Sequence, residues 1–543
     1  MNNEVELKLA LDPGDAAAFR RHPLLREKAI EGPTRRRVFN IYFDSPGLVL
    51  REHRMALRLR KAGGKWLQTL KTAGSLTGGL HQRGEWELPL PAPQLDLALF
   101  RETPLAKLAD SKQLHLTLKP AFTTDFQRTI WLIETAPGQR VEVALDQGWA
   151  RCGSKEGAIC EVEIELIEGG AAAAFDVALV LAEKIALQPD ILSKAERGYR
   201  LFQPTMLTPH RAATVELDKK CHPHQALRSI AAACLDHFEA NVEGALLSND
   251  PEYIHQLRVS LRRLHSAMRI FKPVAQQRFA EELRWLSGVL GEARDWDVLV
   301  AESLPALLKG YGDAAFEKKL LAAGKRRATA CRAAARAALT SRRHALLVIA
   351  LGGWLSISDD VLPATESAQT EDDAKQAVHA EGLSHFASRE IRRRNKRLMG
   401  GVDALAGLSS EARHRVRIDA KRLRYAVDFF SSLFTKRRVA QYLKTLAGIQ
   451  EVLGKANDAA VAERLIVSLA PPEPFIHFAR GWLTARTQAQ MEGIATHFAG
   501  LKKTRRFWLK KSTASQSADN AKIVIGAPLK IQSSPKCKAR KIS

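Results

Sequence analysis

Up to about residue 167, apolar and charged residues alternate with a period of two in short stretches separated by Gly, Pro or Asp. These stretches cover residues 3–11, 37–44, 53–61, 65–71, 83–90, 127–134, 140–146 and 159–168. Strict alternation is the signature of a strand whose two faces meet different surroundings. Eight such strands at hairpin-like spacing predict a closed or nearly closed antiparallel sheet. Helical segments follow at 171–185 and 193–202.

One face of each predicted strand carries charge. Residues i and i+2 share a face, and the charged rows are Glu4, Glu6 and Lys8; Arg58 and Arg60; Thr69 and Lys71; Arg83, Glu85 and Glu87; Glu142 and Asp146; and Glu161, Glu163 and Glu165. A solvated outer face is one explanation of such rows. The flanking helices and a second domain need apolar outer faces to pack on, however. We therefore favour an inverted sheet whose charges line a water-filled interior.

Such an interior has a specific chemistry. Clustered carboxylates without His or Cys favour Mg²⁺ or Mn²⁺ bound through oxygen. Rows of Arg and Lys favour phosphate oxygens, which Arg can bind in bidentate fashion. The two together predict a phosphoryl-transfer site, and no P-loop, GxGxxG or Ser/His/Asp signature competes with it.

These residues also resemble a known family. Glu4-Val-Glu-Leu-Lys8 matches the ExExK signature of the CYTH superfamily, the triphosphate tunnel metalloenzymes. Supporting segments follow in order at 42–44, 56–60, 68–71, 83–87, 142–146, 161–165 and 193–199. The resemblance covers residues 1–200. It implies an α+β domain: an eight-stranded antiparallel tunnel with flanking helices that binds a triphosphate and one or two divalent ions.

The resemblance also implies roles for individual residues. The implied metal ligands are Glu4, Glu6, Glu163 and Glu165, with Glu161 and Asp146 as further candidates. The implied phosphate ligands are Lys8, Arg58, Arg60, Lys71, Arg83, Arg128 and Lys194. Of these, Glu4, Glu6, Lys8 and Lys194 are expected to be catalytic. The expected mechanism is metal-assisted attack of water on a terminal phosphorus, with the basic rows neutralising charge in the transition state.

The second part of the chain is helical in period and strongly basic. Residues 1–200 hold 28 basic and 26 acidic residues, a net charge of +2, whereas residues 201–543 hold 55 and 33, a net charge of +22. Such a region should attract a polyanion: nucleic acid, an anionic membrane surface or a chain of phosphates. An acidic, irregular stretch at 357–375 interrupts the helical pattern.

An internal repeat lies within this basic part. Residues 252–271 align with 411–430, and Asp295 downstream matches Asp458. At 3.6 residues per turn, each copy has a basic stripe opposite an apolar one, which predicts an all-α domain of two pseudo-repeated bundles. A charged stripe is usually a solvated face. Here it recurs and lacks the acids at i+4 that would relieve it.

The repeat resembles the CHAD domain over about residues 215–500, an α-helical module associated with inorganic polyphosphate. The resemblance implies polyphosphate binding by His255, Arg258, Arg262, Arg263, His414, Arg417, Lys421, Arg422 and Arg424. The second copy departs from the first, because Asn457 and Ala460 stand where the first has Arg294 and Asp297.

We therefore expect a CYTH tunnel domain at 1–203, a linker at 204–214, a CHAD domain at 215–505 and a basic, disordered tail at 506–543. The expected activity is that of an inorganic triphosphatase, which cleaves tripolyphosphate to diphosphate and phosphate. Class IV adenylate cyclase and thiamine triphosphatase remain alternatives, since all three hold a triphosphate and metal. A non-catalytic polyphosphate-binding or granule-associated protein is the alternative from another class.

Other features bear on partners and location. Aromatic residues make up only 6% of the chain and no base-stacking motif accompanies the basic stripes, which disfavours but does not exclude a nucleic-acid partner. The longest apolar run, 345–355, is too short for a bilayer of about 30 Å, so we expect a buried helix and no membrane insertion. Scattered cysteines and the absence of a signal-peptide pattern predict a cytoplasmic protein. The helical domain could localise it to polyphosphate granules.

Overall fold

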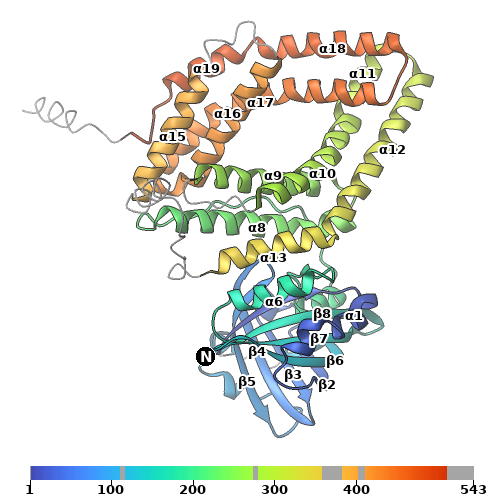
Figure 1. The fold of residues 1–543 in the computed structure, drawn as a ribbon, viewed down its shortest axis with the longest axis vertical. Coiled ribbons are helices and arrows are strands. Elements are labelled where there is room, and N and C mark those ends of the chain that lie inside the picture. Colours follow the sequence, from blue (N-terminus) through green and yellow to red (C-terminus); the bar gives the residue numbers. More distant parts are fainter. Residues whose placement is uncertain (1, 110–116, 273–278, 358–381, 402–409, 510–543) are drawn as a thin grey trace, which may run out of the picture.

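The computed structural model describes residues 2–109, 117–272, 279–357, 382–401 and 410–509. The N-terminal part is built on strands β1 (Asn2–Ala10), β2 (Thr34–Asp44), β3 (Ala56–Ala62), β4 (Lys65–Thr77), β5 (Leu80–Leu90), β6 (Lys119–Ala136), β7 (Gln139–Cys152), β8 (Lys155–Glu168) and β9 (Gln188–Pro189). Its helices are α1 (Ala16–Arg20), α2 (Pro23–Glu27), α3 (Val49–Glu52), α4 (Ala106–Ala109), α6 (Ala172–Ala182) and α7 (Lys194–Phe202). Figure 1 shows this part below a separate helical region.

The sheet closes on itself, as the sequence predicted. Its strands run in the order β5-β4-β3-β2-β6-β7-β8-β1-β9, and an additional pairing of β5 with β1 joins the two ends. Neighbouring strands are antiparallel throughout. Eight strands therefore form the closed wall, and the two-residue β9 adds to the end of β1.

The inverted arrangement of the sheet is confirmed. Leu7 and Leu9 of β1 face outward and pack in a core cluster with Phe175 of α6. The alternate residues Glu4 and Lys8 line the interior. Hydrophobic burial therefore occurs between the sheet and its covering helices, and the interior is left to the charged side chains.

Strands β4 and β5 are longer than the alternating pattern predicted. They continue to a two-residue turn at Gly78 and Gly79, whose φ angles are 61° and 79°. Positive φ at both turn positions suits the twist of a tight hairpin and favours glycine. By contrast, the strand predicted at 53–61 is shorter in the structure. It starts only at Ala56, after the short helix α3 at 49–52.

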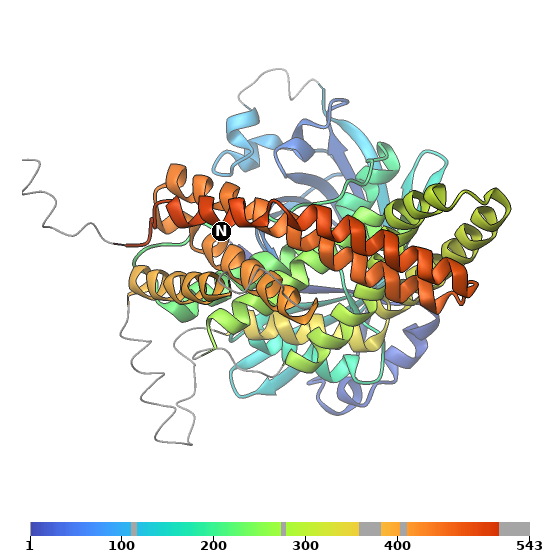
Figure 2. The ribbon, with the colours of Figure 1, turned by 90° about the horizontal axis from the view of Figure 1, so that it is seen from above.

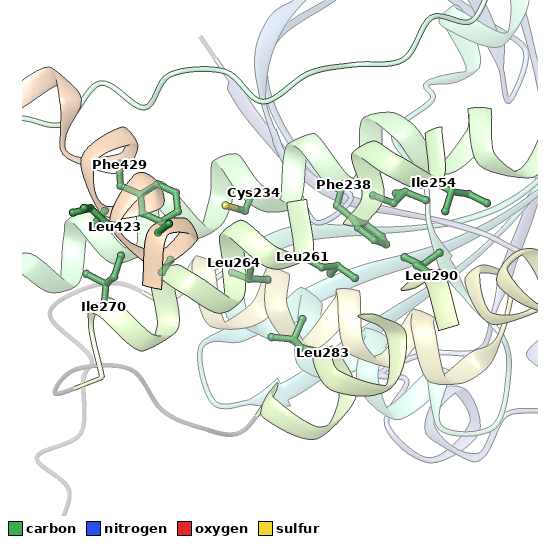
Figure 3. Packing of buried hydrophobic residues seen from close by; sticks show 14 of the residues in the cluster. Cys234, Phe238, Ile254, Leu261, Leu264, Ile270, Leu283, Leu290, Leu423 and Phe429 are labelled. Carbon is green, nitrogen blue, oxygen red and sulfur yellow. The ribbon is translucent and has the colours of Figure 1, made fainter. Parts of the chain in front are cut away.

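The helical region follows an extended connection. Its helices are α8 (Pro223–Leu247), α9 (Pro251–Ile270), α10 (Ala280–Val298), α11 (Leu304–Tyr311), α12 (Ala314–Leu339), α13 (Arg342–Ser356), α15 (Leu383–Gly400), α16 (Ser410–Phe429), α17 (Lys436–Ser468), α18 (Glu473–Met491) and α19 (Ile494–Lys503). The two copies of the sequence repeat form equivalent helix pairs, α9 with α10 and α16 with α17. Figure 3 shows Leu261 and Leu264 of α9 within the core that α8 and α10 share.

The two parts of the chain contact each other through α13 and α6. Figure 1 shows α13 at the boundary, and Figure 2, turned by 90°, shows the helical region lying over the strands. Phe175 of α6 packs on Gly352 of α13, where a Cβ atom would come within 2.5 Å of the ring. Gly78 of the β4–β5 turn also approaches Gly352 so closely that a Cβ on Gly78 would lie 2.8 Å from its Cα. Small residues on both sides permit this contact.

The apolar run at 345–355 forms part of α13 and is largely buried, as predicted. Within the described ranges, no helix combines the length and the hydropathy that a membrane span requires. The acidic stretch from 358 onward and the tail beyond 509 lie outside the described residues.

Candidate active site

The closed sheet and the start of α7 enclose a cavity of about 830 Å³ with a charged lining. Predicted site residues that line it are Glu4, Lys8, Arg58, Arg60, Lys71, Arg83, Arg128, Glu163, Glu165 and Lys194. The remaining three, Glu6, Asp146 and Glu161, are buried in the wall, with exposed fractions of 2%, 0% and 0%. The structure therefore brings the whole set predicted for the tunnel together.

Three carboxylates surround the ammonium group of Lys194. Its Nζ lies 2.6 Å from Asp146, 2.5 Å from Glu161 and 2.9 Å from Glu163. Lys194 stands here because Ser193 Oγ accepts a hydrogen bond from a backbone N–H of the first turn, which starts α7 at Lys194. Burial would lower the pKa of Lys194, but the carboxylates raise it above its usual value. Lys194 is therefore a cation at neutral pH.

Two of these carboxylates, together with Glu6, hold two further cations. Lys8 forms ion pairs with Glu163 and, at 3.2 Å, with Glu6. Arg128 donates to both carboxylate oxygens of Asp146 at 2.8 and 2.6 Å and also pairs with Glu163. Burial would raise the pKa of Glu163, but the surrounding cations outweigh it and hold that pKa well below its usual range.

A second cluster joins β1 to β4 and β5. Glu4 stands opposite Arg83 in the register of β1 and β5. Lys71 Nζ donates to both oxygens of Glu4 at 2.6 and 2.8 Å, and Arg83 Nε donates to Glu4 at 3.0 Å. Arg83 also pairs with Glu6. Burial would raise the pKa of Glu4, but Lys71 and Arg83 hold it below its usual range.

Glu165 differs from these carboxylates, because no basic side chain of the described residues forms an ion pair with it. Register places it opposite Glu6 of β1 and Glu142 of β7. Burial, together with the charges of Glu4, Glu6 and Glu142, raises the pKa of Glu165 to about 7. This part of the cavity is short of positive charge.

Arg58 and Arg60 form a basic row on β3. Arg58 donates to Tyr42 Oη at 3.3 Å and pairs with Glu85 at 3.4 Å, and Arg60 pairs with Glu87 at 3.2 Å. Burial, followed by the charge of Arg58, lowers the pKa of Arg60 to about 10, so the guanidinium remains charged at neutral pH. Both arginines thus present cations to the cavity.

Three further arginines line the cavity although they were not predicted: Arg36, Arg51 and Arg54. Arg36 lies on β2, opposite Arg128 of β6. Arg54 precedes β3 and has a φ of 55°, so the strand period that marks Arg58 does not extend to it. Arg51 belongs to the short helix α3, and no periodic pattern marks it.

The carboxylates fit a hard divalent cation, because every donor is an oxygen. Asp146, Glu161 and Glu163 each offer one oxygen, and these oxygens lie within 4.8 Å of one another. Lys194 already bonds to all three, however. Among the residues that the structure describes, Glu165 has no such basic partner. The buried acidic cluster of the tunnel is thus consistent with a divalent metal site.

The basic stripes of the two repeats meet where α9 contacts α16. Arg258 and Arg262 come from α9, and Arg417 and Lys421 come from α16; we call these four residues the basic cluster. Burial, and then the charges of the three arginines, lower the pKa of Lys421 to about 7, although Asp458 of α17 opposes this. The cluster therefore concentrates positive charge, which neighbouring carboxylates neutralise only in part.

The matched aspartates of the repeat lie beside this cluster. Arg258 donates to Asp295 of α10 at 2.9 Å, and Arg464 approaches the same carboxylate at 3.8 Å. In the other copy, burial lowers the pKa of Arg417, and the negative charge of Asp458 opposes this shift. The repeated Asp therefore serves as the acidic neighbour of the repeated Arg in both copies.

Other residues predicted for polyphosphate binding have partners of their own. His414 Nδ1 lies 3.3 Å from Asn457 Oδ1, and Arg424 donates to Gln450 at 2.8 Å. Burial, and then the charge of Arg294, lowers the pKa of His255 to about 4.

Arg263 and Arg422 occupy different surroundings from the basic cluster. Arg263 is 7% exposed, pairs with Asp428 of α16, and lies 5.0 Å from the ring centroid of Phe429. It links the two repeats inside the helical core. Arg422 pairs with Asp419 at 3.4 Å and lines a separate cavity of about 290 Å³.

Both parts of the chain match known domain families. The CYTH domain model matches residues 2–199, and the CHAD domain model matches residues 229–467. The chain carries an N-terminal CYTH domain and a C-terminal CHAD domain, which confirms the resemblance seen in its motifs.

Particular relatives can be named as well. The inorganic triphosphatase of Haemophilus influenzae is 36% identical over 213 residues, which are 38% of this chain and 57% of that protein. The chain thus spans little more than half the length of this curated relative. A crystal structure of the CHAD domain from Ricinus communis is 33% identical, covers 55% of this chain and 98% of its own, and has a TM-score of 0.47. A putative adenylyl cyclase from Hippeastrum, described as revealing a dominant triphosphatase activity, is 18% identical, covers 36% and 95%, and has a TM-score of 0.28.

Proposed function

We propose that the tunnel hydrolyses inorganic triphosphate to diphosphate and phosphate with Mg²⁺ or Mn²⁺, and that the helical domain binds inorganic polyphosphate. The observation that carries the first part is the cavity of about 830 Å³, in which carboxylates and basic side chains interleave. The identity of 36% to the Haemophilus influenzae inorganic triphosphatase supports the same substrate.

The basic rows are the proposed phosphate ligands. Arg58, Arg60 and Arg128 present guanidinium groups, which can bind phosphate oxygens in bidentate fashion. Lys8 and Lys194 are cations at neutral pH, because their carboxylate neighbours raise the pKa of each ammonium group. They stabilise negative charge that develops on the phosphoryl group, and they do not act as bases.

Glu4, Glu6, Glu163 and Glu165 are the proposed holders of the divalent ion, and Asp146 and Glu161 stand behind them. Glu165 is central to this assignment, since bound positive charge would oppose the burial and the neighbouring negative charges that together raise its pKa to about 7. When bound, Mg²⁺ or Mn²⁺ neutralises phosphate charge and lowers the pKa of water. The tunnel wall holds the substrate in line and limits the access of bulk water.

The two tyrosines of the cavity lining favour an inorganic over an organic leaving group. Tyr42 stacks on Phe122 at 4.6 Å and is held by Arg58. Tyr199 donates its hydroxyl to Asp44 at 2.9 Å. These rings are engaged in wall contacts, which argues against a pocket for adenine or thiamine. Class IV adenylate cyclase and thiamine triphosphatase therefore rank below the inorganic triphosphatase.

The test is phosphate release by the full chain from tripolyphosphate, ATP and thiamine triphosphate, with Mg²⁺ and with Mn²⁺. We expect tripolyphosphate to be the best substrate. Hydrolysis should fall at least about 100-fold in the double variant Glu4→Gln, Glu6→Gln. The matched control is Glu134→Gln, because that side chain is 47% exposed and lies outside the cavity lining. Cyclic AMP as the main product, or full activity of the double variant, would contradict the proposal.

Polyphosphate binding by the helical domain needs a separate test. Replacing Arg262 and Lys421 by Ala in the full chain should weaken binding of long polyphosphate and leave tripolyphosphate hydrolysis intact. Competition with duplex DNA at matched salt decides between a polyphosphate and a nucleic-acid partner, since both affinities depend on salt. Equal polyphosphate binding by the variant and the wild type would rule out the basic cluster as the binding site.

A further inference from the structure

A cavity of about 290 Å³ lies in the helical domain, where the C-terminal end of α9 meets α15 and α16. We call it the arginine pocket, because five of its eight lining residues are arginines. None of the four residues of the basic cluster lines it, and none of its lining residues lines the tunnel. The lining consists of Ser266, Arg269 and Ile270 of α9, Arg393, Arg394 and Arg397 of α15, and Asp419 and Arg422 of α16.

Two of the arginines on α15 share one carboxylate. Arg393 and Arg394 both pair with Glu390, which lies one turn before them on the same helix and is 5% exposed. The Arg393 side chain is nevertheless 65% exposed, so its guanidinium group is accessible to a ligand. One buried carboxylate thus serves two guanidinium groups.

A second carboxylate is shared in the same way. Arg397 and Arg422 donate to Asp419 at 3.1 and 3.4 Å, and the Arg397 side chain is 68% exposed. Arg269 is exposed and forms no ion pair within the described ranges. The five lining guanidinium groups and the two shared carboxylates therefore carry a net charge of +3.

The arginines of the pocket also repel one another. Burial lowers the pKa of Arg422, and the positive charge of Arg269 adds to this shift. Burial likewise lowers the pKa of Arg394; Glu390 opposes the shift, whereas Arg393 and Arg422 add to it. Arginine keeps its charge at neutral pH despite such shifts, so a bound anion would relieve the repulsion.

We propose that the arginine pocket binds a diphosphate group. A single phosphate group carries a charge of about −1.5 to −2 at neutral pH, so one phosphate leaves part of the +3 unmatched and two joined phosphates balance it. The planar guanidinium groups bind phosphate oxygens in bidentate fashion. The hydroxyl of Ser266 can donate a further hydrogen bond.

The shape of the site distinguishes this ligand from a long polyphosphate chain. Arg269 lies about two turns beyond Arg262 of the basic cluster on α9, or about 10 Å along the helix axis. An extended chain would follow such a stripe along a helix, whereas the arginine pocket gathers its cations from three helices around one cavity. The proposal does not depend on hydrolysis in the tunnel, although diphosphate is the product proposed there.

The test is isothermal titration calorimetry of the full chain with inorganic diphosphate, in EDTA and at fixed ionic strength. Its outcome is independent of the proposed hydrolysis, which needs a divalent ion. We expect a saturable class of sites that binds at least about 10-fold more weakly in the double variant Arg269→Ala, Arg393→Ala. This variant leaves each of the two shared carboxylates with an arginine partner.

The matched control is Arg480→Ala, Arg486→Ala, which removes the same charge from exposed sites on α18 and should bind like wild type. Any diphosphate that binds in the tunnel contributes equally to all of these proteins. Ser266→Glu tests the location without touching an arginine, because it places a carboxylate at the wall of the pocket and should abolish the same class of sites. Circular dichroism and the melting temperature check that each variant is folded.

Orthophosphate and ADP define the ligand more closely. Orthophosphate should bind at least about 10-fold more weakly than diphosphate. ADP binding as tight as that of diphosphate would identify the diphosphate group of an ester as a source, and weaker ADP binding would identify free diphosphate. Equal affinity of wild type and the pocket variants, equal binding of orthophosphate and diphosphate, or loss of these sites in Arg262→Ala, Lys421→Ala instead would each overturn the proposal.

Discussion

Lys421 makes polyphosphate binding dependent on pH near neutrality. Burial and the charges of Arg262, Arg417 and Arg258 hold its pKa at about 7, against an ordinary value of 10.5. A polyanion bound to the basic cluster would favour the charged form. The chain should therefore take up a proton when it binds polyphosphate above pH 7.

The size of this effect follows from the pKa. With a value of about 7, the free chain has roughly nine-tenths of Lys421 protonated at pH 6 and roughly one-tenth at pH 8. If only the charged form binds, apparent affinity falls about 10-fold from pH 6 to pH 8, or about 1.4 kcal/mol. Between about pH 7 and 10.5 the unfolded chain holds more protons at this residue than the folded chain, so stability rises with pH across that window.

The assay is calorimetric titration with long-chain polyphosphate at both pH values, in two buffers of different ionisation enthalpy. We expect wild type to take up about 0.9 proton at pH 8 and about 0.1 at pH 6. Lys421→Arg keeps its charge at both pH values and should lose this difference. Lys455→Arg, at an exposed site of α17, should retain it. Terminal phosphates and histidines contribute equally to the pH dependence of both proteins. A wild-type pH dependence equal to that of Lys421→Arg would therefore refute the reasoning.

Three further predictions concern the tunnel and the core. Acidification below about pH 7 should weaken Mg²⁺ binding by up to about 10-fold per pH unit, because it protonates Glu165, and magnesium titrations should find this loss absent in Glu165→Gln. Gly198→Ala should destabilise the protein by about 1–3 kcal/mol, because the new Cβ would lie 2.0 Å from a phenylalanine ring of β6; Gly170→Ala, which meets nothing within 4 Å, is the control in thermal denaturation. Arg263→Met should cost about 2 kcal/mol by leaving Asp428 without its partner, and a double-mutant cycle with Asp428→Asn should recover part of that loss.

The tunnel could be predicted because its charges follow the strand period. Each row on β1, β3 and β8 appears in the sequence as every second residue, so residues such as Glu4 and Arg58 were found from local pattern. The alternation does not report which charges neutralise each other. That depends on register, which sets Glu165 opposite Glu6 and Glu142 and leaves it without a basic partner in the described ranges. Arg51 escaped prediction because it reaches the cavity from a short helix.

The helical domain shows a similar limit. The stripe of Arg258 and Arg262 could be predicted, because a helix repeats every 3.6 residues. Adjacent residues on a helix differ in direction by about 100°, so Arg263 leaves the face of Arg262. Its pairing with Asp428 joins segments far apart in sequence, and no local period encodes such a contact.

The close contact between the β4–β5 turn and α13 has a consequence for how the protein can be dissected. Deleting the helical region would uncover Phe175 of α6, which packs on Gly352 and Gly353 of α13, and a fragment with such an apolar patch is prone to self-associate. It would also remove the contact between α13 and the β4–β5 turn, which connects the strands of Lys71 and Arg83. A loss of hydrolysis in an isolated tunnel fragment would therefore report on the integrity of its wall. Side-chain replacement in the intact chain is the way to separate the capture of polyphosphate from catalysis.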